Sequence, residues 1–175
     1  MGLELLINRY GIGIGGSSII SRSLGSKNYG NAHKTFENQI SLTLGLSILF
    51  VLLGTYFCVP ILELFGANGD IIIPATEYFH VVIYGVPFLA FAMMGNPVIR
   101  AVGKPKYAMY AMILPAILNI ILDIVFIKLF GWGMFGAGLA TTISYAICGL
   151  FVLGFFLSSK SVLKIDPKYF VLDFS

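Results

Sequence analysis

Long apolar runs without charge alternate along the chain with short charged segments. Residues 38–59 and 78–99 contain no Asp, Glu, Lys or Arg, residues 107–127 contain only Asp123, and residues 129–159 contain none. Each run is long enough for a helix of about 20 residues, which crosses a hydrocarbon core of roughly 30 Å. The pattern predicts four membrane-spanning helices, over about 37–59, 77–99, 107–127 and 135–157.

The opening segment is different from these runs. Glu4 and Arg9 lie in its first half, and only residues 10–20 are free of charge, which is too short to cross a membrane alone. Glu4 precedes any basic residue, and a Gly-rich apolar stretch follows, unlike a cleavable signal peptide. We therefore expect a helix over about 5–21 that forms the cytoplasmic half of a further span.

Lys and Arg residues are distributed unevenly among the connecting segments. Three lie in residues 22–34, none in 60–74, three in 100–106, one in 128–134 and three in the tail, 160–175. The positive-inside rule produces this alternation when every second loop is cytoplasmic. The count predicts a multi-pass protein of the cell (inner or plasma) membrane, with loops 22–34 and 100–106 and the C-terminal tail in the cytoplasm.

Composition agrees with a lipid environment. Apolar residues make up 58% of the chain and charged residues 11%, with a mean hydropathy of +0.91, whereas soluble domains carry about 25% charged residues. The net charge of +3 is small and scattered, which argues against a nucleic-acid partner. The sequence contains no metal-ligand cluster, phosphate loop or nucleophile with its base, so we expect neither an enzyme nor a bound cofactor. Cys58 and Cys148 fall in apolar stretches, where free cysteines act as small apolar side chains.

One acid interrupts the apolar runs, and other unusual residues share its helix. An ionisable side chain inside a membrane is costly and usually functional. Asn119 precedes Asp123 by four residues and Pro115 precedes Asn119 by four, so the three share one helical face. Pro115 removes a helical hydrogen bond and frees the carbonyl of Ala111. Pro87, in the middle of the predicted span 77–99, predicts a second kink.

The chemistry that this face suggests is ion coupling. A low dielectric disfavours the charged form of a carboxyl, so Asp123 is placed to exchange a proton for a cation such as sodium. Asn119 would hydrogen-bond the carboxyl or help to coordinate the ion, and Thr141 or Thr142 on the next helix would add a hydroxyl. In the alternative interpretation, Asp123 lies near the membrane surface and pairs with Lys128.

Several segments resemble a known transporter family. They are Gly15–Gly25 with its Gly-Gly-Ser-Ser opening, Gly85–Phe88, Asn96–Gly103, Leu118–Ile127 and Gly133–Thr142. In order and spacing they are similar to the second to sixth helices of the multidrug and toxic compound extrusion (MATE) family. The resemblance covers about residues 11–160 and implies an all-α, polytopic membrane helix bundle, a partial six-helix lobe of a MATE-like transporter.

The resemblance also implies an activity. Members of the family are secondary active antiporters with two six-helix lobes that expel drugs or organic cations in exchange for protons or sodium ions. Asn119, Asp123 and Thr141 match members of the first-lobe polar cluster that handles the coupling ion. The first helix and the second lobe are missing from residues 1–159, and residues 160–175 resemble the cytoplasmic linker between lobes. The alternatives are a lipid-linked saccharide flippase of related fold, which would favour a cationic cavity, or a non-transporting truncated fragment.

Overall fold

The chain folds into a bundle of helices. The computed structural model describes residues 14–158 and Leu163, and these residues form helices and short connections without any strand. The predicted all-α fold class is therefore confirmed. The first half of the predicted helix 5–21 lies outside the described residues. The elements are α2 (Ile14–Gly25), α3 (Tyr29–Tyr56), α4 (Cys58–Leu64), η1 (Gly69–Ile71), α5 (Ile72–Ile83), α6 (Val86–Ala101), α7 (Pro105–Asp123), η2 (Ile124–Leu129) and α8 (Gly133–Leu157).

Three of these elements are long and apolar enough to cross a membrane individually. They are α3, the continuous segment of α7 and η2, and α8. A fourth crossing is formed if η1 and α5 are counted together with α6, because this pair passes the same criteria as one span bent by 51°. The described residues thus contain three helices that are long and apolar enough to cross a membrane, or four with the bent pair, in the regions where the sequence predicts four.

Helix α3 begins earlier than the apolar pattern predicts, at Tyr29 instead of about residue 37. The side chain of Asn28 caps it by accepting a hydrogen bond from the backbone N–H of Asn31 at 3.2 Å. Such a cap satisfies one of the free N–H groups of a helix end. The charged segment 22–34 is consequently mostly helical, and the connection between α2 and α3 is reduced to residues 26–28.

The predicted span 77–99 is divided into α5 and α6. The N–H of Gly85 donates to the carbonyl of Val82, three residues back, at 2.9 Å. In a continuous α-helix it would donate to Val81, four residues back. Pro87 lies in the first turn of α6, where its missing N–H is tolerated. The break therefore falls at residues 84–85, just before the proline that predicted a kink.

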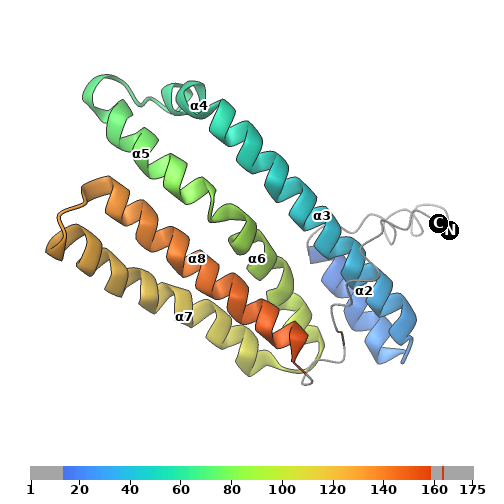
Figure 1. Ribbon diagram of the computed structural model, residues 1–175. Helices are drawn as coiled ribbons and strands as arrows, with labels where there is room; N and C mark the ends of the chain where they lie inside the picture. Colours follow the sequence, from blue (N-terminus) through green and yellow to red (C-terminus); the bar gives the residue numbers. More distant parts are fainter. Residues whose placement is uncertain (1–13, 159–162, 164–175) are drawn as a thin grey trace.

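Helix α8 is the central element of the bundle. It packs against α5, α6 and α7, while α6 also contacts α3 and α2 (Figure 1). The connections α2–α3 and α6–α7 and the C-terminal end of α8 lie at one end of the bundle, with α4 and the α7–α8 turn at the opposite end (Figure 1). Side chains of α8 can thus contact both α7 and the bent span formed by α5 and α6.

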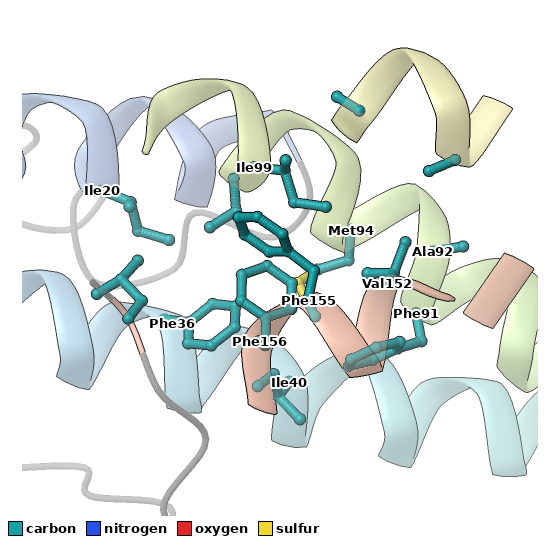
Figure 2. Packing of buried hydrophobic residues seen from close by; sticks show 14 of the residues in the cluster. Ile20, Phe36, Ile40, Phe91, Ala92, Met94, Ile99, Val152, Phe155 and Phe156 are labelled. Carbon is teal, nitrogen blue, oxygen red and sulfur yellow. The ribbon is translucent and has the colours of Figure 1, made fainter. Parts of the chain in front are cut away.

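The best-packed part of the core lies where α2, α3, α6 and α8 meet (Figure 2). Phe36 of α3 and Phe156 of α8 are both fully buried, with ring centroids 4.6 Å apart. Val152 of α8 and Ile99 of α6 are also fully buried in the same cluster. Close packing of this kind resists small displacements, so it fixes one end of α8 relative to α3 and α6.

Candidate functional site

Two of the three predicted coupling residues are in contact. Asn119 of α7 donates a hydrogen bond from its Nδ2 to the Oγ1 of Thr141 on α8 at 3.3 Å. The Thr141 hydroxyl in turn donates to the carbonyl of Ala137, one turn back in its own helix, at 3.0 Å. Both side chains are half-buried between the two helices. A polar bridge therefore joins α7 to α8 within two mostly apolar helices.

Asp123, the third predicted residue, ends α7 one helical turn beyond Asn119. Its Oδ1 is buried and has no hydrogen-bond partner among the described residues. Lys128, the alternative partner, is exposed and forms no ion pair with Asp123 in this part of the chain. A buried carboxylate oxygen without a partner is costly, and the oxygen would be satisfied by a proton or a bound cation.

The backbone changes immediately after Asp123. Residues Ile124–Leu129 form a π-helix, in which the N–H of Phe130 donates to the carbonyl of Val125 at 3.0 Å. Short π-helical segments are rare in proteins overall, and those that occur are often found at functional sites. Around the turn into α8, Phe126 stacks on Phe130 and on Trp132, and Phe130 and Trp132 pack at a tilt, with ring centroids 5.2 to 6.2 Å apart. The sequence analysis did not anticipate this segment.

The predicted free carbonyl of Ala111 has a partner from the next helix. Helix α7 continues through Pro115, and the thiol of Cys148 on α8 donates to the Ala111 carbonyl at 3.0 Å. The apolar surroundings of Cys148 suggested only a small filling side chain. Cys148 lies opposite the carbonyl that Pro115 frees, and this position shows that its thiol also acts as a hydrogen-bond donor.

Thr142 contacts the other side of α8. Its hydroxyl donates to the carbonyl of Val81 on α5 at 2.8 Å, so it points away from Asn119. Of the two threonines that could place a hydroxyl at the polar face of α7, only Thr141 reaches it, where its oxygen accepts the hydrogen bond from Asn119. Asn96 likewise bonds a neighbouring helix, donating to the Ala108 carbonyl of α7 at 2.8 Å.

The oxygen atoms at this site are suited to bind a hard cation or a proton. A carboxylate, an amide and a hydroxyl provide oxygen ligands, the type that hard metal ions prefer. The described residues contain no group of three or more His, Cys, Asp or Glu side chains that could bind a metal on their own. The site is thus a polar cluster between two membrane-crossing helices, as found in multi-pass proteins that move ions or solutes.

The comparisons with known proteins identify the family. The sequence model of the MatE family matches residues 6–125, more than half of the 175 residues. The chain belongs to this family of membrane transporters, which confirms the resemblance seen in its motifs. Among its relatives, the "Multidrug export protein MepA" of Staphylococcus saprophyticus subsp. saprophyticus is 31% identical over 157 residues, 90% of this chain.

Solved structures agree with the sequence matches. The chain is similar to a multidrug resistance MATE family transporter of the MOP superfamily in its inward-facing conformation, with a TM-score of 0.84, 30% identity, and 94% of this chain and 38% of that chain covered. An outward-facing structure of such a transporter gives a TM-score of 0.81 at 30% identity, over 95% and 37% of the two chains. The chain spans 35% of the length of the Staphylococcus saprophyticus relative.

Proposed function

We propose that this chain forms part of a secondary active antiporter that exports drugs or organic cations in exchange for protons or sodium ions. Family membership and relatives described as multidrug export proteins support the transport activity. The observation that carries the coupling role is the buried, unpartnered Oδ1 of Asp123, one turn from the bond between Asn119 and Thr141. Ligands from other parts of a longer transporter, including a first helix and a second lobe, would complete the site.

In this mechanism the coupling ion neutralises a carboxylate that the membrane interior disfavours. A proton or sodium ion binds Asp123, while the bond between Asn119 and Thr141 joins α7 to α8 and orients the oxygen ligands. Neutralisation removes a desolvation cost that is several times the thermal energy. Because inward- and outward-facing relatives match this chain almost equally well, the overall arrangement of these helices would be kept during the transport cycle, with only local adjustments between neighbouring helices.

Membrane orientation follows from the basic loops. The basic connections α2–α3 and α6–α7 lie at the same end of the bundle (Figure 1), and the positive-inside rule assigns that end to the cytoplasm. Asp123 and the π-helix lie towards the opposite end. The coupling ion would therefore enter the site from the outer side of the membrane, the direction in which proton and sodium gradients act.

Replacing the carboxyl while keeping its shape tests the coupling role. We expect Asp123→Asn, in the complete natural protein, to reduce ion-driven export of a fluorescent organic cation from cells at least tenfold, because a neutral amide takes up no proton at neutral pH and lacks the negative charge that would balance a sodium ion. Asp70→Asn is the matched control, since Asp70 is an exposed acid in η1. Unchanged export by Asp123→Asn, at equal membrane expression, would contradict the assignment.

Purified protein in liposomes separates the two ions. Export is measured under an imposed proton gradient without sodium, and then under a sodium gradient at equal pH on both sides. The gradient that drives transport in the parent protein and fails to drive it in Asp123→Asn identifies the coupling ion. If neither gradient moves the substrate in the parent protein, the antiport proposal is wrong.

A further inference from the structure

Two consecutive threonines of α8 bond different neighbouring helices. Successive residues of an α-helix point about 100° apart, so Thr141 and Thr142 face different sides. Thr141 accepts a hydrogen bond from Asn119 of α7 at 3.3 Å, and Thr142 donates to Val81 of α5 at 2.8 Å. One turn of α8 therefore links the polar cluster of α7 directly to the bent span.

The carbonyl that Thr142 binds is the one that the bend exposes. In a continuous helix the carbonyl of Val81 would accept the N–H of Gly85. That N–H donates instead to Val82 at 2.9 Å, and the hydroxyl of Thr142 takes its place. Inside a membrane no water is available to satisfy such a group, so the 51° bend between α5 and α6 depends on a donor from α8.

The helices approach too closely at this point for independent movement. A Cβ added to Gly85 would lie 3.2 Å from the Cα of Thr142 and 3.1 Å from the carbonyl oxygen of Val82. A Cβ on Gly138, one turn before Thr142, would lie 3.2 Å from the carbonyl oxygen of Tyr78 on α5. The backbone of α8 thus rests against the backbone of the bent span.

We propose that Thr142 is a positioning residue that couples the ion site to the α5–α6 bend. The inference rests on the proposed ion-coupling function of Asn119, Asp123 and Thr141. An ion bound at that cluster competes with Asn119 for the oxygen of the Thr141 hydroxyl. This competition shifts or rotates α8 relative to α7. Because one helical turn is rigid, the shift changes the Thr142–Val81 hydrogen bond and with it the angle between α5 and α6.

A hydroxyl deletion that keeps the side-chain shape tests this coupling. In the complete natural protein in liposomes, Thr142→Val should lower the apparent affinity for the driving ion about tenfold, a typical effect of losing one buried hydrogen bond. Thr142→Ser, which keeps the donor, should stay within about twofold of the parent protein. The matched control is Thr76→Val on α5, because within the described part of the chain the Thr76 hydroxyl donates only to the carbonyl of Ile72 in its own helix, at 2.7 Å.

A distance measurement provides a readout that loss of stability alone would not change. Spin labels attached after Ile73→Cys and Met93→Cys report the distance between α5 and α6, since both side chains are more than 60% exposed while the native Cys58 and Cys148 are buried. Addition of the driving ion should shift this distance in the parent protein and in Thr142→Ser, and leave it unchanged in Thr142→Val.

The outcomes separate the two proposals. If ions drive transport and move the labels equally in the parent protein and in Thr142→Val, the coupling through Thr142 is wrong and the ion site stands. If the parent protein responds to neither ion, the ion site itself fails, and the coupling fails with it. Should Thr142→Val not fold, Gly85→Ala keeps the hydroxyl but pushes α8 away from the bend, and it should weaken the ion response in the same way.

Discussion

At the scale of single residues, backbone carbonyls released by Pro115 in α7 and by the break between α5 and α6 are satisfied by side chains of α8. Cys148 binds the carbonyl of Ala111, which Pro115 frees, and Thr142 binds that of Val81. A lipid-embedded helix cannot leave such groups to water. Helix α8 therefore stabilises irregular points in two neighbouring helices and fixes its own rotation between them.

The Cys148 contact predicts a specific order of stability. Cys148→Ala removes the donor and leaves a small void, and it should lower the free energy of unfolding in detergent by about 1–2 kcal/mol. Cys148→Ser keeps a donor in nearly the same volume and should cost less than Cys148→Ala. The measurement is denaturant unfolding followed by circular dichroism. Equal losses for the two variants would mean that the hydrogen bond contributes nothing.

The sequence predicts part of this site but not all of it. The spacing of Pro115, Asn119 and Asp123 places them on one helical face, and the freed carbonyl of Ala111 follows from the proline alone. Which side chain reaches that carbonyl depends on the rotation of α8 against α7. Packing between helices determines this rotation, and no local pattern encodes it. The roles of Cys148 and Thr142 therefore became visible only in the folded chain.

At the scale of helices, glycines allow α8 to touch the bent span. A Cβ at Gly149 would lie 3.0 to 3.2 Å from Phe88 of α6, including its backbone oxygen, whereas a Cβ at Gly154 on the same helix meets nothing within 4 Å. Backbone atoms cannot move aside as a flexible side chain can. The close approach of α6 and α8 is consequently specific to certain glycines of α8 and is not a general property of the helix.

This difference gives a matched pair of substitutions. Gly149→Ala should destabilise the protein by about 1–3 kcal/mol through overpacking. Gly154→Ala should be neutral or should stabilise it by up to about 1 kcal/mol, because alanine is the better helix former. Thermal unfolding in one detergent compares the two. A Gly149→Ala variant as stable as Gly154→Ala would show that the α6–α8 contact is looser than the structure indicates.

Helix boundaries show where charge patterns predict well and where they do not. The uncharged runs locate the membrane-crossing regions because charge is excluded from lipid whatever the details of folding. They do not locate the break at residues 84–85, since a glycine followed by Pro87 is compatible with either a kinked helix or two helices. Nor do they locate the start of α3 at Tyr29, because a helix can continue beyond the lipid into water once Asn28 caps it.

At the scale of the whole molecule, charge and topology agree. The segments 22–34 and 100–106, with three basic residues each, lie at one end of the bundle, and the segments 60–74 and 128–134, with none and one, lie at the other (Figure 1). The charge count uses only the sequence, and the arrangement of helices follows from packing. Two separate properties of the chain thus lead to the same division into a more basic end and a less basic end.

This division predicts which residues are accessible from each side of the membrane. In intact cells, a membrane-impermeant maleimide should label Asp70→Cys and leave Lys104→Cys unlabelled, because we expect loop 100–106 to be cytoplasmic. Both native side chains are exposed, so after the membrane is permeabilised the two variants should label equally. The reverse pattern in intact cells would mean that the bundle has the opposite orientation in the membrane. Asp123 would then lie towards the cytoplasm, where an inward gradient delivers its ion last, and the proposed direction of coupling would have to be abandoned.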